Sequence, residues 1–499
     1  MLSHVQHLNQ LLAGIYSGIS AVDPVITGLC QDSRQLKRGD LFFAYPGLQS
    51  DGRNFLDEVV AKGAAAVLLE AHGQSVRSPT PAIPFISIEH LSAYLGPIAA
   101  RFYGQPSQHL PVIGITGTNG KTSCTHFLAH CLQQQHRSCG IIGTLGNGLY
   151  EHHLKPGLLT TPDALELHQL LAALLAQHAE TVLMEVSSHR LAQQRLNGTA
   201  FSVAAFTNLT RDHLDYHGSM ENYAQAKRSF FDLPGVQHAV LNADDAYGQT
   251  WLRELTGQLP LTAYSIAKPK PALEHIPHVT VRHYQCGREG LRAELATPWG
   301  EMMIENPVLI GTFNLSNLLL VVTLLKLLDF SCADIVCAIS KIKGVDGRLQ
   351  ALYAHQQALV VIDYAHTPDA LEHVLKTLRV YCQGCLYCVF GCGGERDRGK
   401  RALMAKVAEQ HADSLVLTND NPRFEDPAQI IRDIQEGLSE NKPVYIEPDR
   451  RLAIRYAMQK ANPEDVILVA GKGHETYQLI AGVKQPFSDA AEVMAYRHL

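Results

Sequence analysis

Short apolar runs alternate with amphipathic segments along the chain from residue 111 onward. The runs have the length of buried strands, and the segments between them, such as 163–178 and 221–231, have the spacing of helices. Repeated strand-then-helix order is typical of parallel sheets, which bind ligands at the carboxyl ends of their strands. The predicted strands span 112–116, 139–143, 182–186, 203–206 and 239–241, and then 359–362, 386–390, 414–417, 444–446 and 466–469.

The alternation restarts near Gly344, which together with the length of 499 residues predicts an α/β protein of three domains. Residues 1–109 contain short strands and polar turns and end in a linker at 104–107, so we expect a mixed α/β domain. Residues 110–343 should form a central parallel-sheet domain of the P-loop ATPase type, and residues 344–499 a Rossmann-like domain. The last part lacks an intact G-x-G-x-x-G motif, so a nicotinamide cofactor is not expected.

Composition and charge narrow the class of partner. The content of 46% hydrophobic and 18% charged residues is that of a globular protein. A net charge of −6 gives no bias towards nucleic acid or anionic lipid. The N-terminus lacks the features of a signal peptide, and the longest apolar run, 318–328, is too short to cross a bilayer. We therefore expect a cytoplasmic protein with no nucleic-acid partner and no membrane insertion.

Four cysteines are spaced C-x₂-C-x₂-C-x₃-C, which is the pattern of an iron–sulfur ferredoxin: Cys382, Cys385, Cys388 and Cys392. Residues 386–390, however, form an apolar run that predicts a buried strand. An extended strand cannot wrap four thiolates around one cluster, and Gly393 stands where a proline usually follows. We therefore favour buried, reduced thiols, as for all eleven cysteines of a chain without an export signal.

The most informative segment is V-I-G-I-T-G-T-N-G-K-T at 112–122, where a β-branched run leads into a glycine-rich loop. Such a loop directs backbone N–H groups at a phosphate, and the helix that follows adds its dipole. Lys121 could reach β- and γ-phosphate oxygens, and the Thr122 hydroxyl could hold Mg²⁺. The strict P-loop has glycine where Ile115 stands, so this loop is a variant of the motif. Its glycines, Lys121 and Thr122 still predict binding of ATP or GTP.

Glu185 closes a predicted strand of the same sheet, where we expect a Mg²⁺ ligand, although a helix-capping carboxylate is the alternative. His213 and His217 are four residues apart and could form a zinc pair, or belong to an ordinary polar loop. No cysteine or third histidine lies at ligand spacing, so service to Mg²⁺ is favoured over zinc. Lys227 is a lone lysine in a predicted helix, and general physics favours a solvated surface charge.

A series of motifs along residues 32–475 resembles the Mur ligases of peptidoglycan synthesis. In chain order they are G-T-N-G-K-T from 117, E-V-S-S-H from 185, T-N-L-T-R-D-H-L-D-Y-H-G from 207, A-K at 226–227, G-T-F-N-L-S-N from 311, V-I-D-Y-A-H-T-P-D from 361, G-C-G-G-E-R-D from 391, D-N-P-R from 420 and A-G-K-G-H-E from 470. The resemblance implies a cytoplasmic enzyme of cell-wall precursor synthesis, on which cell shape and division depend.

The resemblance implies that ATP phosphorylates the D-Glu carboxylate of UDP-MurNAc-L-Ala-D-Glu. An amine of meso-diaminopimelate then attacks the acyl phosphate, and ADP and phosphate are released. The alternatives are a lysine-adding ligase, a folylpolyglutamate synthetase, or a nucleotide-binding switch without ligase chemistry. We expect closure of the third domain to assemble the active site, and the chain to be a monomer or a weak homodimer.

The resemblance also assigns roles to individual residues. The catalytic residues would be Lys121, Glu185, His213 and Lys227. The Mg²⁺ ligands would be Thr122, Glu185, His213 and Lys227, the last as a carbamate formed with CO₂. A carbamate requires a neutral amine, so the site should depress the pKa of that lysine. The ATP-binding residues would be Gly114, Gly117, Thr118, Asn119, Gly120, Lys121, Thr122, Ser123, Asn314, Arg348 and Asp363.

Residues 1–109 would then bind the UDP substrate and residues 344–499 the amino acid. The UDP-substrate site would comprise Gln31, Ser33, Leu48, Gln49, Ser50, Thr160, Thr161, Ser187, Gln193 and Arg195. The diaminopimelate site would comprise Arg396, Asp420, Asn421, Pro422, Arg423, Gly471 and Glu475. Arg423 offers a planar fork suited to the distal carboxylate, and Glu475 could hold the distal ammonium. Lysine lacks that carboxylate and would leave Arg423 unpaired.

Overall fold

The computed structural model describes residues 4–18, 20, 22–47, 50–71, 83–152, 154–157, 159–287, 289–353, 356–439 and 444–497. Its contacts divide the chain into two compact units. The first unit contains Met1–Tyr264 and Pro269–His278, and the second contains Ser265–Lys268 and Val279–Leu499. The boundaries of the three predicted domains stay predictions.

The first unit begins with a small parallel sheet in the order β3-β4-β5-β6. The strands are β3 (Gly28–Cys30), β4 (Asp40–Ala44), β5 (Ala66–Glu70) and β6 (Phe85–Ile88). The flanking elements are β1 (Gln6–His7), α1 (Leu8–Leu11), β2 (Val25–Ile26), α2 (Leu56–Ala61), α3 (Leu91–Phe102) and α4 (Pro106–His109). The last of these overlaps the predicted linker at 104–107, so part of that segment is helical and not irregular.

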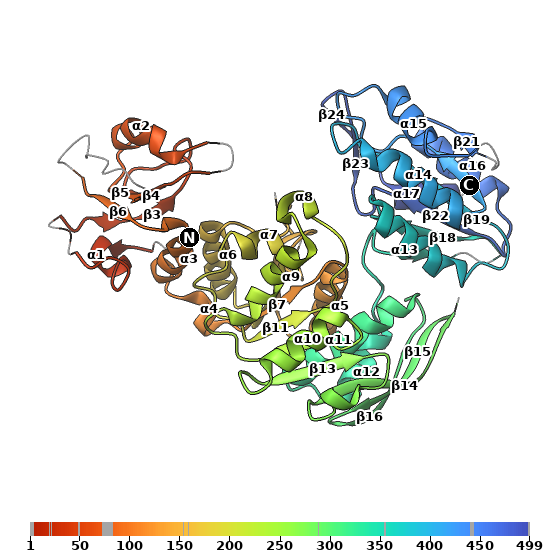
Figure 1. The fold of residues 1–499 in the computed structure, drawn as a ribbon, viewed down its shortest axis with the longest axis horizontal. Coiled ribbons are helices and arrows are strands. Elements are labelled where there is room, and N and C mark those ends of the chain that lie inside the picture. The colour runs from red at the N-terminus through yellow and green to blue at the C-terminus, as the bar shows by residue number, and fades with distance from the viewer. Residues whose placement is uncertain are drawn as a thin grey trace. The chain divides into compact units, whose positions relative to one another are not determined.

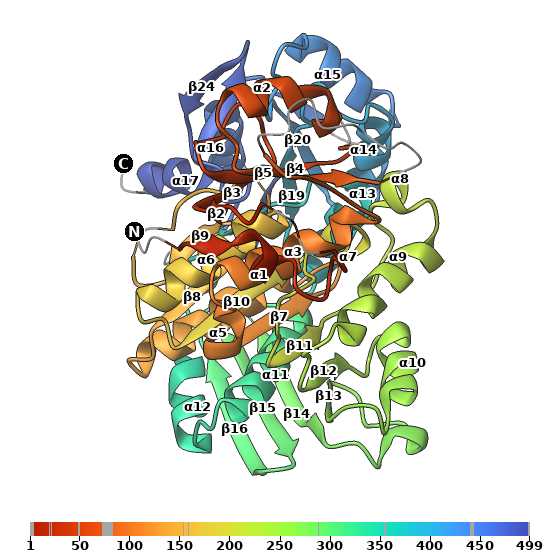
Figure 2. The same ribbon diagram turned by 90° about the vertical axis from the view of Figure 1, so that its left-hand side faces the viewer.

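A larger sheet of the first unit has the order β13-β12-β11-β7-β10-β8-β9, and only β9 runs antiparallel to its neighbour (Figure 2). Its strands are β7 (Val112–Thr116), β8 (Cys139–Gly143), β9 (Gly146–Leu149), β10 (Thr181–Val186), β11 (Val203–Phe206), β12 (Ala239–Asn242) and β13 (Leu261–Ser265). All five residues of β7 are buried, because both faces of a parallel sheet are covered. The five strands predicted between 112 and 241 are confirmed.

Helices of the first unit follow these strands. They are α5 (Lys121–Gln134), α6 (Ala164–Ala176), α7 (Ser188–Ala192), α8 (Leu214–His217), α9 (Met220–Arg228) and α10 (Ala246–Leu255). Aspartates fix two of the starts, because Asp163 accepts from the N–H groups of the first turn of α6 and Asp245 does so for α10. β7 lies between β10 and β11, so the loop after β7 emerges beside the ends of both strands.

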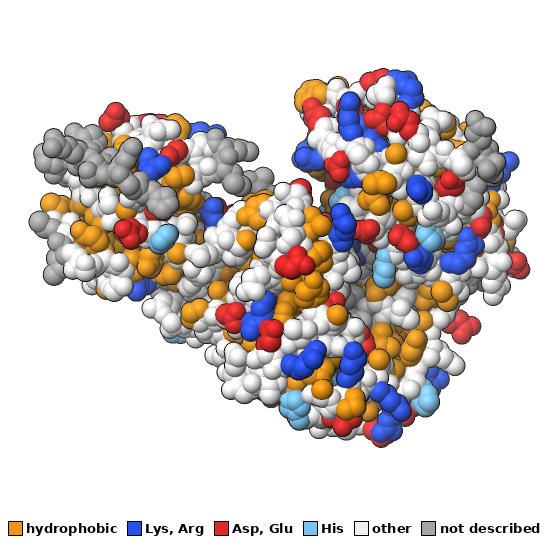
Figure 3. All heavy atoms as spheres, in the orientation of Figure 1, with side chains coloured by type: hydrophobic (Ala, Val, Ile, Leu, Met, Phe, Trp, Pro, Cys, Tyr) orange, Lys and Arg blue, Asp and Glu red, His pale blue; other side chains and the backbone are white. Residues whose placement is uncertain are grey.

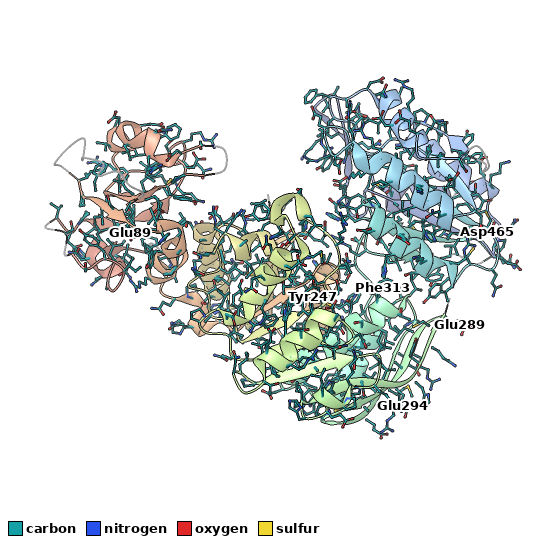
Figure 4. The ribbon with its side chains drawn as sticks, in the orientation of Figure 1. Glu89, Tyr247, Glu289, Glu294, Phe313 and Asp465 are labelled. Atoms are coloured by element: carbon teal, nitrogen blue, oxygen red, sulfur yellow. The ribbon has the colours of Figure 1, made fainter. Side chains whose placement is uncertain are left out.

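The second unit contains an antiparallel ribbon that the sequence reading missed: β14 (His278–Gly287), β15 (Gly290–Thr297) and β16 (Gly300–Asn306). Helices α11 (Thr312–Leu327) and α12 (Cys332–Ser340) follow it. In Figure 4 Phe313 lies at the start of α11, and its ring is 5.8 Å from that of His373. The Gly311 N–H also donates to the Tyr381 hydroxyl at 2.7 Å, so the start of α11 is fixed to the following sheet domain.

That domain is a six-stranded sheet in the order β17-β18-β22-β19-β20-β21, parallel except for β17. The strands are β17 (Gln350–Leu352), β18 (Leu359–Asp363), β19 (Leu386–Phe390), β20 (Ser414–Leu417), β21 (Val444–Ile446) and β22 (Val466–Ala470). The five strands predicted after residue 358 are confirmed. Cys388 is buried within β19, and the Cys392 thiol contacts Met404 Sδ at 3.7 Å.

Helices cover both faces of this sheet, as the Rossmann-like prediction required (Figures 1 and 2). The helices are α13 (Pro368–Arg379), α14 (Gly399–His411), α15 (Pro427–Gln435), α16 (Arg450–Lys460) and α17 (Asp489–Arg497). The first three pack in one core with Leu359 and Val361, and the last two pack in another core with Val360 and Ile362. A hairpin of β23 (Tyr477–Ile480) and β24 (Val483–Pro486) follows β22.

The distribution of surface charge and the character of the helices complete the description of the fold. On the face drawn in Figure 3, acidic and basic side chains are interspersed. Among the residues that the structure describes, no helix combines the length and the apolar character that crossing a membrane would need.

Candidate active-site regions

The loop after β7 has the backbone that its glycines predict. Gly117 has φ +151°, and a Cβ atom there would clash with Thr207 Oγ1. Gly120 has φ +87° and caps the start of α5, so the helix begins at Lys121 as predicted. A glycine with positive φ at a helix start lets successive backbone N–H groups face one anion.

The segment after β11 holds this loop in place. The Thr118 N–H donates to Asn208 O at 2.8 Å, and the Asn119 N–H donates to Asn208 Oδ1 at 2.9 Å. The Thr207 hydroxyl donates to Asn119 O at 2.6 Å. The first residues of the T-N-L-T motif therefore support the loop, a role that the sequence reading did not assign.

Gly114 has a different reason to be glycine. It lies in the middle of β7, and a Cβ atom there would be 2.5 Å from Phe230 Cζ and 2.8 Å from Phe201 Cε1. Tight packing between the strand and two aromatic rings explains this glycine. Its place in the ATP site stays a prediction.

Two lysines meet at one carbonyl of the loop. Lys121 Nζ donates to Gly117 O at 2.8 Å and to Thr118 O at 2.9 Å, and Lys227 Nζ donates to Gly117 O at 2.8 Å. Lys227 is 1% exposed, so the surface-charge interpretation from general physics is wrong. Burial, reinforced by the charge of Lys121, lowers the pKa of Lys227 well below its ordinary value.

Glu185 lies at the end of β10 and contacts the start of α5. Its Oε2 accepts from the Thr122 hydroxyl at 2.8 Å and from the Thr144 hydroxyl at 3.0 Å. Its Oε1 accepts from the Thr144 N–H at 2.8 Å. Thr144 was missed, although it directly follows a predicted strand of the same sheet. Thr122 and Glu185 together present hard oxygen donors beside the phosphate loop, which fit Mg²⁺.

His213 belongs to a cluster of histidines behind the loop. Its ring is 4.7 Å from that of His189, and the His217 ring is 5.4 Å from that of His189. Burial lowers the pKa of each of these three histidines, and that of His189 falls to about 4. Within the described ranges, no group of three or more His, Cys, Asp or Glu side chains could hold a metal ion. The structure thus joins Thr122 to Glu185, but among the described residues the histidines around His213 do not form a group that could hold a metal ion.

Two predicted UDP-substrate residues, Gln31 and Arg195, belong to one hydrogen-bonded group in the first unit. Gln31 Nε2 donates to Asp163 Oδ2 at 2.6 Å, and Gln31 Oε1 accepts from the Tyr45 hydroxyl at 2.8 Å. Arg195 Nη1 donates to the same hydroxyl at 3.3 Å. Tyr45 is a connecting residue that the sequence reading missed, since nothing in its local pattern marks it.

A second group of predicted UDP-substrate residues lies around Arg190, a residue that the sequence reading also missed. Arg190 Nε donates to Thr161 O at 3.0 Å, and Arg190 Nη1 donates to Gln193 Oε1 at 2.8 Å. The Ser187 N–H donates to Thr161 Oγ1 at 3.1 Å, and Thr160 Oγ1 accepts from the Thr144 hydroxyl at 3.2 Å.

Ser33 makes its side-chain hydrogen bond outside both groups. Ser33 donates from its hydroxyl to Glu58 Oε2 at 3.2 Å. Ser50 follows Leu48 and Gln49, which lie outside the described residues.

The second unit contains a cavity of about 310 Å³ at the carboxyl ends of its parallel strands. Six of the seven predicted diaminopimelate residues line it, and Pro422 does not. The lining also includes Lys400 and two residues after β18. The full lining is Tyr364, His366, Gly391, Cys392, Gly393, Arg396, Lys400, Asp420, Asn421, Arg423, Gly471 and Glu475.

Lys472 lies beneath this cavity and was missed. It is fully buried, and its Nζ donates to Asn421 Oδ1 at 3.1 Å and to Glu475 Oε2 at 2.8 Å. Asn421 Nδ2 donates to the same Glu475 oxygen at 2.8 Å. Burial raises the pKa of Asp420, and the charges of Arg450 and Lys472 oppose that rise.

Three predicted ATP-site residues also belong to the second unit. Asn314 is buried, and its amide donates to Ile310 O at 2.9 Å. Asp363 accepts from the Leu349 N–H at 2.7 Å, and Arg348 lies 5.0 Å from the ring centre of Tyr364. Asp363 and Arg348 therefore lie beside the cavity, because Tyr364 lines it.

Known proteins resemble this chain over nearly its whole length. Family models match as the Mur ligase family, catalytic domain, at 25–103, the Mur ligase middle domain at 115–325, and the Mur ligase, glutamate ligase domain, at 347–473. The UDP-N-acetylmuramoyl-L-alanyl-D-glutamate–2,6-diaminopimelate ligase of Coxiella burnetii is 48% identical over 489 residues, or 98% of each chain. The ligase of the same name from Pseudomonas aeruginosa is 47% identical over 470 residues, or 94% of each chain.

A solved structure of a ligase with this name has a TM-score of 0.72 at 33% identity and covers 99% of this chain and 100% of its own. The chain therefore belongs to the Mur ligase family.

Proposed function

We propose that the chain is an ATP-dependent ligase that joins meso-diaminopimelate to UDP-MurNAc-L-Ala-D-Glu. Relatives that are 48% and 47% identical are named for the addition of diaminopimelate to this nucleotide dipeptide. The observation that best supports the proposal is the cavity of the second unit, which presents Arg396 and Arg423 together with Asp420 and Glu475. The distal end of diaminopimelate carries both a carboxylate and an ammonium, so its carboxylate could pair with the arginines of the cavity and its ammonium with the cavity's carboxylates.

The residues of the first unit suit activation of a carboxylate by ATP. A carboxylate becomes an acylating group when its oxygen is phosphorylated, because phosphate then departs in place of oxide. Attack of the carboxylate on the γ-phosphate of ATP brings two anions together, so fixed positive charge beside them lowers the barrier. Lys121 would supply that charge at the phosphate loop. Thr122 and Glu185, with His213 and carbamylated Lys227, would hold Mg²⁺, which neutralises phosphate charge when bound.

Lys227 has the environment that carbamylation requires. Its ammonium is buried against the Gly117 carbonyl, and its lowered pKa favours the neutral amine that attacks CO₂. The carbamate would replace a cation by an anion able to ligate Mg²⁺. The test is Lys227→Ala, for which we expect loss of ligase activity and partial recovery with short carboxylates. Normal activity of the variant would contradict this role.

The amino acid would be chosen in the second unit. Arg423 would pair the distal carboxylate of diaminopimelate, and Glu475 its distal ammonium. Lysine has no distal carboxylate, so Arg423 would stay unpaired, and such a loss gives discrimination of up to about 10⁴-fold. The nucleotide substrate would be held by Gln31, Arg195 and the other predicted residues of the first unit, in a cytoplasmic monomer or weak homodimer.

The decisive assay is ADP release with each substrate omitted in turn. We expect release to require both UDP-MurNAc-L-Ala-D-Glu and meso-diaminopimelate. Arg423→Met should lower kcat/KM for diaminopimelate about 100-fold, the effect of about 3 kcal/mol from a lost charged pair. Arg432→Met, on the exposed face of α15, is the matched control and should change nothing, because the Arg432 side chain is 57% exposed. Equal turnover of L-lysine would favour the lysine-adding ligase, and release without substrates would favour the switch.

A further inference from the structure

The hairpin of β23 and β24 holds the loop that carries Arg423. One edge of β23 pairs with β24, and the other edge forms an isolated parallel bridge between Ile480 and Arg423. The Arg423 N–H donates to Leu479 O at 2.9 Å, and the Ala481 N–H donates to Arg423 O at 2.6 Å. The loop is therefore bridged through Arg423 to the outer edge of β23.

Side chains add to these backbone bonds on the same edge. Gln478 Nε2 donates to Asp420 O at 2.9 Å, and the Leu479 N–H donates to Asn421 Oδ1 at 2.9 Å. Asp420, Asn421 and Arg423 all line the cavity, whereas no described residue of β23 or β24 does. The hairpin thus acts on the cavity through the loop.

The backbone of Arg423 shows why the loop needs this support. Its φ is +56°, a left-handed conformation that a non-glycine residue keeps only when its surroundings enforce it. Bonds on both its N–H and its carbonyl supply that constraint. The conformation lets Arg423 reach back, because its Nη1 donates to Gly394 O at 2.7 Å across the cavity wall.

We infer that the β23–β24 hairpin is a specificity-determining element, and that Gln478 is a positioning residue that fixes Arg423 for the distal carboxylate of the amino acid. This inference rests on the proposed function. A guanidinium must be held in place for two of its N–H groups to meet a carboxylate. Loosening the loop weakens recognition of that carboxylate and leaves the rest of the reaction unchanged.

The test compares Gln478→Leu with Gln485→Leu. Gln485 is the cross-strand partner of Gln478 on the exposed strand β24, so the control makes the same change in the same hairpin. We expect Gln478→Leu to raise KM for meso-diaminopimelate about three- to tenfold, the effect of one lost hydrogen bond. Its kcat and its KM for ATP should stay unchanged, and kcat/KM for L-lysine should also be unchanged. The preference for diaminopimelate over lysine therefore falls by the same factor.

A purely structural role would lower kcat and the amount of folded enzyme for all substrates alike. If Gln478→Leu and Gln485→Leu have the same diaminopimelate KM, the inference is wrong. If the leucine variant does not fold, Gln478→Met decides, because it keeps the length of the side chain and removes the Nε2 donor without adding a charge. Wild-type enzyme without diaminopimelate-dependent ADP release would overturn the proposed function itself, an outcome distinct from equal behaviour of the two variants.

Discussion

Replacement of Lys472 by methionine tests how the cavity of the second unit is held together. The change keeps the length of the side chain and removes a fully buried ammonium. Glu475 loses a charged hydrogen bond of 2.8 Å, and Asn421 loses one of 3.1 Å. Breaking a buried ion pair costs about 3–5 kcal/mol, and the Glu475 side chain is 20% exposed, so we expect the lower end, about 3 kcal/mol.

The loss should depend on pH in a direction that the structure sets. Burial raises the pKa of Asp420 in the folded protein, and removing Lys472 raises it further. Between the unfolded and folded pKa values the folded protein binds more protons, so its stability falls as pH rises through this window. The stability difference between Lys472→Met and wild type should therefore narrow in acid, where protonated Asp420 needs no neighbouring cation.

Urea unfolding at neutral and acidic pH measures both effects, and steady-state kinetics should show a raised KM for diaminopimelate. Lys484→Met is the matched control, because Lys472 and Lys484 both lie over the Tyr477 ring, but Lys484 is on the exposed strand β24. Exposed substitutions of this kind change stability by less than about 0.5 kcal/mol. If Lys472→Met matched Lys484→Met in unfolding free energy and in KM, the positioning role of the buried ammonium would be refuted.

Three further substitutions test buried groups inside each of the two units. In CO₂-free buffer the unfolding free energy of the wild type should rise with pH towards 10.5, the ordinary lysine pKa. The reason is that Lys227 binds its proton more tightly in the unfolded chain than in the folded one. Lys227→Met should lack this rise when unfolding is measured across the same pH range. Gly114→Ala should cost about 1–3 kcal/mol in urea unfolding because its Cβ meets Phe230, and an unchanged midpoint would contradict that packing. Asp489→Ala should cost about 3–5 kcal/mol of unfolding free energy because it leaves buried Arg450 unpaired. The double variant Arg450→Met with Asp489→Leu should recover most of that loss. Equal stabilities of the single and double variants would rule out this cost of an unpaired buried charge.

The sequence predicts the parallel strands well because both of their faces are buried. Strand β7 is a continuous apolar run, and all of its residues are buried. The ribbon β14–β16 was missed because only one of its faces is buried, so apolar and polar residues alternate. The alternation of Leu291, Ala293 and Leu295 carries that signal and could have revealed it.

The candidate sites were predictable where a motif carries its own geometry. The glycines around Lys121 define the phosphate loop, and Asp420–Arg423 follows a strand end. Lys227 and Lys472 were different, because a lysine is normally solvated and only the fold shows that each is buried. The family resemblance supplied the role of Lys227, and nothing in the sequence reading supplied that of Lys472.

The cavity that we propose for the amino acid lies within the second unit, and most of its lining comes from loops that follow strands of one sheet. The phosphate loop and its supporting lysines belong wholly to the first. Under the proposed function, the residues that choose the amino acid and the glycine-rich loop that holds the phosphates therefore lie in different units, although Asn314, Arg348 and Asp363 of the predicted ATP site belong to the second. Under the same proposal, mutations in the loop at 420–423 or in its hairpin would change which amine is accepted, while Gly117, Lys121 and Lys227 stay as they are. A ligase family can thus diversify its products by altering one loop of one unit.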